Sequence, residues 1–141
     1  MKIRSQFKYS LYVSVLFLYL TGVLYWVLDQ WFKVDRGLGL EASPFAALSL
    51  HSHSILGLWF LILFGYLFHS HILPGLKRKQ KLRSGWCILS VCLVLILTVP
   101  GLFYLSDDSS HHVVSVIHIY IGLLSLFVFV FHIFRKISQK K

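Results

Sequence analysis

Charge is scarce in this chain, and acidic charge above all. Only 13% of the 141 residues are charged and five are acidic, while 57% are hydrophobic and the mean hydropathy is +0.73. A soluble domain ordinarily carries about 25% charged residues, because it must cover itself with a surface that water wets. The missing polar surface excludes an ordinary soluble domain and indicates that the surrounding solvent is lipid.

Cysteine is also rare, and its spacing excludes several uses. Cys87 and Cys92 lie five residues apart in one apolar stretch. Because a helix turns by about 100° per residue, the two side chains point to different faces and suit neither a disulfide nor a chelate. The C-x-x-C-H pattern of covalent c-type haem attachment is absent. The sequence also lacks a glycine-rich nucleotide-binding loop.

Four apolar stretches are long enough to cross a hydrocarbon core, which needs about 20 residues. No Asp, Glu, Lys or Arg lies inside them, and apolar residues surround each stretch on all sides rather than along one stripe. We therefore predict an all-α integral membrane protein, a four-helix bundle in which residues 1–141 form a single transmembrane domain. The predicted helices cover about residues 9–28, 45–73, 86–105 and 113–134.

Basic residues are distributed unevenly between the two ends of these helices. Twelve of the 14 precede the first helix, separate the second from the third, or follow the fourth. The other two, Lys33 and Arg36, lie in the first loop, on the same side as all five acidic residues. Under the positive-inside rule both termini are cytoplasmic, and we expect a bacterial inner membrane. This distribution also argues against nucleic acid as a partner.

The eight histidines are concentrated on two of the four predicted helices. The second helix carries His51, His53, His69 and His71, and the fourth helix or its entrance carries His111, His112, His118 and His132. Ionisable residues inside a membrane are costly and commonly mark a functional site. His111 and His112 adjoin two aspartates, which suits the headgroup layer. His118 lies about one and a half turns deeper among apolar neighbours, which suits a ligand.

Helical spacing places these histidines in two layers. His118 and His132 are 14 residues apart, about 21 Å of helix with an angular offset near −40°, so they share one face. On the second helix, His53 and His71 are 18 residues apart, which is five whole turns. His53 and His69 are 16 apart and about 160° out of phase on a straight helix.

An internal repeat supports the outer layer. The second helix reads His53-Ser-Ile-Leu-Gly57 and the fourth reads His118-Ile-Tyr-Ile-Gly122. Each is preceded by a helix with a glycine near its outer end, Gly22 or Gly101, so the chain resembles two tandem hairpins. Gly57 and Gly122 could let a flat macrocycle approach the backbone, or could serve helix packing instead.

These observations favour haem over zinc or copper. Neutral imidazole binds all three, but zinc normally takes four ligands from a compact cluster. Two layers of facing imidazoles suit six-coordinate haem iron, whose other four ligands come from the porphyrin, and helical bundles commonly hold such cofactors. We predict b-type haem, two groups rather than one. The predicted ligands are His53 with His118, and His132 with His71 or His69.

The pattern resembles the membrane-embedded di-haem b-type cytochromes, including the cytochrome b subunits of formate dehydrogenases and nickel-iron hydrogenases. It also resembles small four-helix bacterial cytochromes that exchange electrons with quinone. The resemblance covers the second to fourth helices and rests chiefly on the 14-residue spacing of His118 and His132. For the inner haem, the family's shorter spacing prefers His69, whereas helical phase prefers His71.

The resemblance implies transmembrane electron transfer between the quinone pool and a redox partner, with the chain as a subunit of a larger complex. No residue is assigned a catalytic role. One alternative is a stand-alone quinone-linked oxidoreductase with a site in the outer loops. Another, from a different class, is a transition-metal-binding or transport protein that uses His51, His53, His111 and His112.

Overall fold

The structure, a computed structural model, describes residues 4–35, 40–77 and 83–138. Of this part of the chain, 91% is helical, and it contains four helices long and apolar enough to span a membrane: Ser5–Trp31, Pro44–Lys77, Gly85–Tyr104 and Asp108–Phe134. The all-α class and the four apolar spans are thereby confirmed. The cytoplasmic location of the termini stays a prediction.

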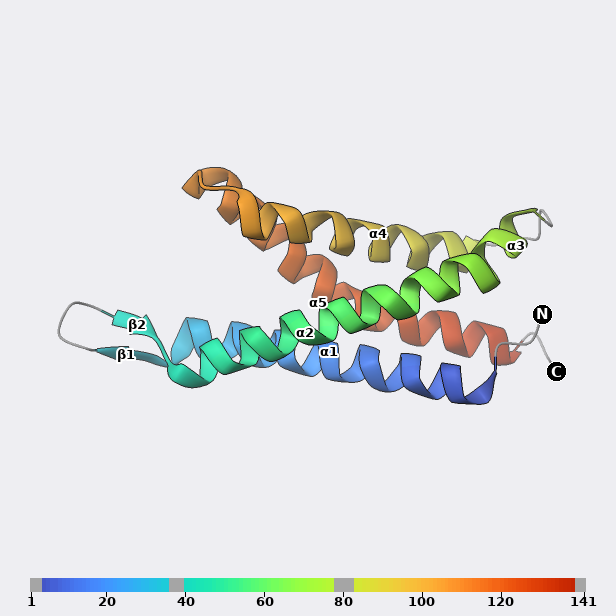
Figure 1. The fold of residues 1–141 in the computed structure, drawn as a ribbon, viewed down its shortest axis with the longest axis horizontal. Coiled ribbons are helices and arrows are strands. Elements are labelled where there is room, and N and C mark those ends of the chain that lie inside the picture. Colours follow the sequence, from blue (N-terminus) through green and yellow to red (C-terminus); the bar gives the residue numbers. More distant parts are fainter. Residues whose placement is uncertain (1–3, 36–39, 78–82, 139–141) are drawn as a thin grey trace. The chain divides into compact units, whose positions relative to one another are not determined.

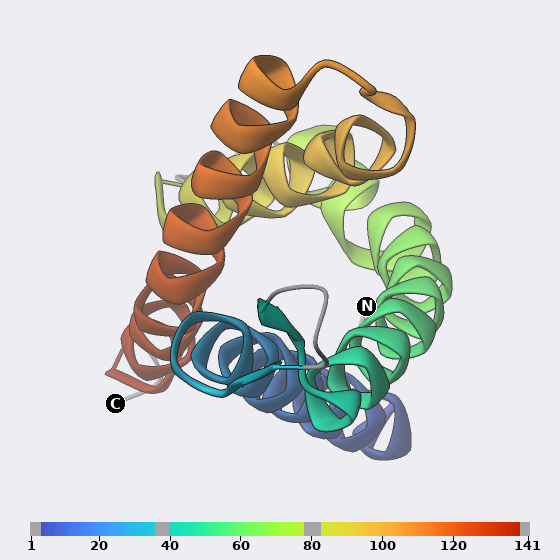
Figure 2. The same ribbon diagram turned by 90° about the vertical axis from the view of Figure 1, so that its left-hand side faces the viewer.

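The chain divides into two compact units, Met1–Lys77 and Arg78–Lys141, and each is a helical hairpin (Figure 1). The two helices of each hairpin are joined at one end by a short connecting segment (Figures 1 and 2). This division agrees with the internal repeat in the sequence. The assignment of both hairpins to one transmembrane domain stays a prediction.

The first unit pairs α1 (Ser5–Trp31) with α2 (Pro44–Leu67). Between them, β1 (Lys33–Asp35) and β2 (Leu40–Ala42) form an antiparallel ribbon in which Val34 is opposite Glu41. The Ser43 hydroxyl accepts a hydrogen bond from the Ala46 amide, and Pro44 occupies the first helical position, where a missing N–H costs little. The sequence pattern did not predict the ribbon.

The second predicted helix does not continue as a regular α-helix. After Leu67 comes a π-helical segment, η1 (Phe68–Ile72), and then a short α3 (Leu73–Lys77). The Leu73 amide donates to the Phe68 carbonyl, five residues back. Pro74 explains the change, because it lacks the N–H that would bond to the Ser70 carbonyl and its ring would clash with that carbonyl.

The second unit pairs α4 (Arg83–Tyr104) with α5 (Asp108–Ser138). Asp107 caps α5: its carboxylate accepts a hydrogen bond of 2.8 Å from the Ser110 amide, and its carbonyl accepts one of 2.9 Å from the His111 amide. The helix therefore begins five residues before the apolar run at 113. Hydropathy identifies the apolar part of a helix, whereas capping decides where the helix starts.

Small residues lie where the first two helices approach each other. Ser14, Ala46 and Ser49 are buried, and the Ser49 hydroxyl donates to the Thr21 carbonyl at 2.9 Å. In contrast, large apolar side chains face outward, including Tyr104 at 85% exposure and Leu97 at 73%. Large apolar side chains are expected to face outward where lipid replaces water. Small residues are expected at the helix contact, because they let two helices approach closely.

Candidate histidine sites

His53 lies in the half of α2 that is next to the β-ribbon. Its Nδ1 is 3.0 Å from the Leu18 backbone carbonyl of α1 and 3.3 Å from the Thr21 hydroxyl. A carbonyl oxygen can only accept, so Nδ1 must carry the proton and donate it. This assignment leaves the lone pair on Nε2, the nitrogen with which such a histidine binds a metal.

Gly22 allows this imidazole to lie against α1. A Cβ placed on Gly22 would be 2.9 Å from Cε1 and 3.1 Å from Nδ1 of His53. Real Cβ atoms are hardly ever so close to another heavy atom, so any larger residue would displace the ring from the Leu18 carbonyl. The repeated glycine of the first hairpin therefore has a local role in seating His53.

His118 has the corresponding contact in the second hairpin. Its Nδ1 is 2.7 Å from the Thr98 hydroxyl of α4. Thr98 has a single hydroxyl proton, and it donates this proton to the Leu95 carbonyl at 2.8 Å. The hydroxyl can then only accept from His118, so Nδ1 again carries the proton and Nε2 the lone pair.

The helix contact that supports this bond lies one turn away. A Cβ placed on Gly101 would be 3.0 Å from Val114 Cγ1. Gly101 follows Thr98 by three residues, and Val114 precedes His118 by four, so the two contacts occupy the same faces of α4 and α5. The close approach at Gly101 thus keeps Thr98 within reach of His118.

His132 lies on the same uninterrupted helix as His118. Because α5 is α-helical from Asp108 to Ser138, the 14-residue phase relation holds along it. His132 is partly buried, and its Nδ1 is shielded from solvent.

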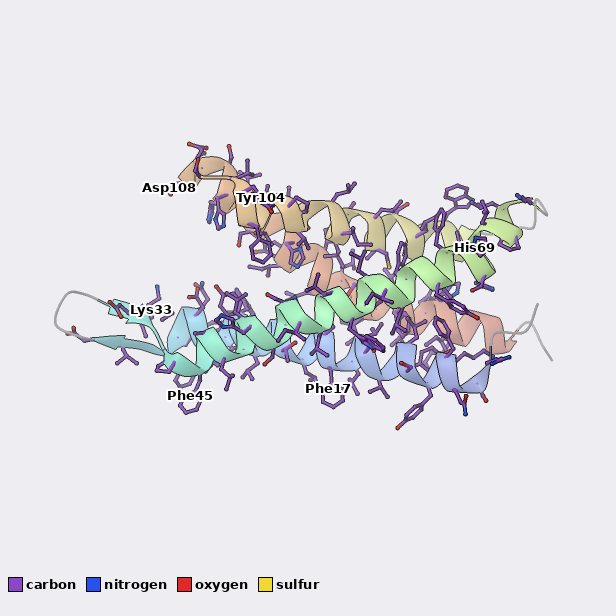
Figure 3. The ribbon with its side chains drawn as sticks, viewed as in Figure 1. Phe17, Lys33, Phe45, His69, Tyr104 and Asp108 are labelled. Carbon is purple, nitrogen blue, oxygen red and sulfur yellow. The ribbon has the colours of Figure 1, made fainter. Side chains whose placement is uncertain are left out.

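The π-segment removes the phase argument that ranked the inner ligands of the second helix. An i→i+5 turn includes about one extra residue, so side chains beyond it lag by up to about 100°. His69 and His71 both belong to η1 and are exposed, on either side of the buried Ser70. His69 lies far from the β-ribbon residue Lys33 along the hairpin (Figure 3). Because the helix is not a regular α-helix at these residues, helical phase no longer favours His71 over His69.

The remaining histidines differ from His53 and His118. The Nδ1 of His51 bonds to the Ala47 carbonyl of its own helix at 2.6 Å, and its side chain is exposed. His111 and His112 are exposed in the first turn of α5. No group of three or more His, Cys, Asp or Glu side chains suited to one metal ion occurs in the described part of the chain.

The glycines of the repeat have two different surroundings. Gly22 and Gly101 are in tight contact with the partner helix, as described above. A Cβ added to Gly57 or Gly122 would have no heavy atom of the described residues within 4 Å beyond its own chain neighbours and helix backbone. Gly57 and Gly122 therefore make no such close contact among the described residues, and their role stays a prediction.

Two functional candidates, Thr21 and Thr98, were missed from the sequence. A threonine in an apolar helix ordinarily bonds to its own helix, and both do so here. Their link to the histidines depends on which helix faces meet. A usable indication was present, because each lies within three residues of the glycine that brings its hairpin together.

A comparison with protein-family models, curated proteins and solved structures finds no match to this chain.

Proposed function

We propose that this chain is a membrane-bound b-type cytochrome, which carries electrons across the bilayer between the quinone pool and a redox partner. The observation that carries the proposal is the matched pair His53 and His118. Each lies on the second helix of its hairpin, and each donates its Nδ1 proton to an acceptor on the first helix. Metal-ligating histidines typically have such a partner, because it sets the tautomer and the orientation of the ring.

The two imidazoles also agree in depth. His53 lies nine residues after the start of α2 and His118 ten after the start of α5. At 1.5 Å per residue these positions are about 14 Å and about 15 Å along their helices. Both helices begin on the side that the basic residues assign to the outside. One porphyrin that bridges them needs such matched depth.

The donor set fits haem. Two neutral imidazoles offer Nε2 lone pairs, and a porphyrin supplies the other four ligands of six-coordinate iron. When bound, haem would supply the one-electron chemistry that the side chains of this chain lack. The Leu18 carbonyl and the Thr98 hydroxyl would orient the two imidazoles. Gly57 and Gly122, four residues beyond the two ligands, would let the macrocycle lie close to the backbone.

A second haem belongs to the proposal. His132 would be its ligand on α5, and His69 or His71 would be the ligand near η1. Counted from the outer ends of the helices, His132 lies 24 residues into α5 and His69 25 residues beyond Pro44. The two haems would thus occupy opposite leaflets, as electron transfer across the membrane requires. The expected setting is a bacterial inner membrane, where the chain joins a larger redox complex.

Absorption spectroscopy tests the haem assignment. The purified full-length chain should be red, with a b-type pyridine haemochrome, haem extractable by acid acetone and about two haems per chain. A colourless protein that contains stoichiometric zinc or copper would contradict the proposal. Steady-state oxidation of a quinol by the purified chain would distinguish a stand-alone oxidoreductase from an electron-transfer subunit.

Histidine variants test the division into two layers. His118→Ala should remove the outer haem and leave the inner one, whereas His132→Ala should do the reverse. The haem-to-protein ratio and the reduced-minus-oxidised spectrum report both results. Full haem content with an unchanged spectrum in His132→Ala would exclude the inner haem and leave a single-haem cytochrome.

A further inference from the structure

The two outer histidines are held by different acceptors. His53 donates to a backbone carbonyl, Leu18, which no side-chain substitution removes, and the Thr21 hydroxyl is a longer secondary contact. His118 instead bonds to the side-chain hydroxyl of Thr98 on α4, at 2.7 Å. The two contacts therefore differ in whether a side-chain substitution can remove the acceptor.

We propose that Thr98 is a positioning residue for His118, which holds the imidazole in its Nδ1–H tautomer, aims Nε2 and raises its basicity. This inference rests on the proposed haem function. Thr98 can act this way because its own proton is committed to the Leu95 carbonyl, which orients the hydroxyl lone pairs toward the histidine. An acceptor at Nδ1–H adds electron density to the ring, and so stabilises ferric over ferrous iron at Nε2.

The surrounding residues explain why this position suits the role. The Gly101–Val114 contact fixes the distance between the helices one turn from the bond. Pro100 lies inside α4 and lacks an N–H for the Ile96 carbonyl, so α4 has one helical hydrogen bond fewer beside Thr98. Thr98 is partly buried, so its side chain is partly shielded from solvent.

The test compares three variants of the full-length holoprotein. Thr98→Val keeps the shape and removes the acceptor, Thr98→Ser restores the hydroxyl, and Thr21→Val removes the corresponding threonine of the first hairpin. We expect Thr98→Val to weaken haem affinity by about 10- to 100-fold and to raise the midpoint potential of the outer haem. Thr98→Ser should return both quantities toward wild type. Thr21→Val should change them less than Thr98→Val, because the Leu18 carbonyl still holds His53.

A merely structural role predicts a different pattern. If Thr98 only packs the helices, Thr98→Val, which is nearly isosteric, leaves the midpoint potential at the wild-type value, and this result overturns the inference. Equal damage from Thr21→Val and Thr98→Val also overturns it.

Nitrogen-15 NMR of the histidines separates this inference from the haem proposal. In the full chain without haem, His118 should show a protonated Nδ1 in wild type and Thr98→Ser, and a mixture of tautomers in Thr98→Val. If wild type binds no haem, the proposed function fails while this measurement still tests the contact. An unchanged His118 tautomer in Thr98→Val would overturn the role of Thr98 even if haem binds.

Discussion

At the scale of single residues, the four repeated glycines provide a sensitive test of where a ligand lies. Gly22→Ala would place a methyl group 2.9 Å from the His53 ring, which must then leave its place beside the Leu18 carbonyl. Gly57→Ala would place one where no described atom lies within 4 Å outside its own helical neighbourhood. The two substitutions are chemically identical and lie in the same hairpin, so each controls for the other.

We expect the two alanine variants to affect the haem-free chain in opposite directions. Gly57→Ala should stabilise it by about 0.5–1 kcal/mol, because alanine is the better helix former, whereas Gly22→Ala should destabilise it through the displaced ring. Both should bind haem more weakly, Gly57→Ala because the methyl group obstructs the macrocycle. Thermal unfolding and haem titration measure these effects. Normal haem affinity in Gly57→Ala would argue that the macrocycle does not lie against this face.

The histidines and Thr98 show which parts of the candidate site can be predicted from the sequence and which cannot. The repeat with Gly57 and the depth along the helix favoured His53 over His51 as a ligand, which stays a prediction, and the structure gives these two histidines different hydrogen-bond partners. Hydropathy and spacing could not find Thr98, because its role depends on an interhelical contact between residues 20 positions apart. A single sequence shows which residues share a face of one helix, but it does not show which faces of two helices pack together.

At the scale of elements, the π-segment shows how one residue can change a helix. The phase argument for His71 assumed 3.6 residues per turn throughout, whereas Pro74 removes one backbone donor and η1 precedes it. The choice between His69 and His71 thus depends on backbone hydrogen bonding rather than on sequence spacing. Pro74 is visible in the sequence, but residue spacing alone does not account for its missing backbone N–H.

Pro74→Ala should restore the α-helical hydrogen bond to the Ser70 carbonyl and convert η1 toward α-helix. The side chains of His69 and His71 would rotate with the backbone. We therefore expect an altered spectrum or midpoint potential of the inner haem and an unchanged outer haem. The matched control is Pro44→Ala, at the first position of α2, where the regained N–H has no helical partner and little should change. An inner haem unaffected by Pro74→Ala would show that neither histidine of η1 is its ligand.

The first turn of α5 should respond to pH through Asp107. Hydrogen bonds from Ser110, chiefly from its backbone amide, hold the pKa of the Asp107 carboxyl below its ordinary value. A depressed folded-state pKa contributes stability above the ordinary value, near 4, and that contribution is lost as pH falls through the folded-state pKa. Hydrogen-exchange protection of the Ser110 and His111 amides, corrected for the intrinsic rate, should therefore fall in acid.

Asp107→Asn gives the matched control, because asparagine also caps helices well but does not titrate in this range. Its protection should lack the acid-dependent fall, while Asp107→Ala should show reduced protection at every pH. Any contribution from His111 and His112 is common to all three proteins. The same acid dependence in Asp107→Asn would assign the effect to another group.

At the scale of the whole molecule, sequence alone predicted the secondary structure class and the four spans found in the described residues, because lipid imposes long apolar helices. It did not predict the β-ribbon or the capped start of α5, since three-residue strands and polar first turns lie outside the apolar runs. The Thr–His contacts depend on interhelical packing. The sequence therefore indicated which histidines lie far inside the apolar segments, and the structure adds the hydrogen-bond acceptors of His53 and His118.

The distribution of charge predicts the orientation of the molecule in the membrane. An even number of spans places both termini on one side, and 12 of the 14 basic residues lie on that side. Moving such basic segments outward is disfavoured, so both termini should be cytoplasmic. His53 and His118 would then lie toward the outer leaflet, and His69, His71 and His132 toward the cytoplasm.

Cysteine labelling of the full chain tests this orientation. In a background of Cys87→Ala and Cys92→Ala, the variant Ser109→Cys should react with a membrane-impermeant maleimide in intact cells. The variant Lys77→Cys should react only after the cells are opened, and both positions are exposed in the structure, so burial does not confound the comparison. The reverse pattern would invert the molecule and exchange the two layers. The pairing of histidines would survive that inversion, because it depends on depth along the helices, but the direction in which electrons enter would not.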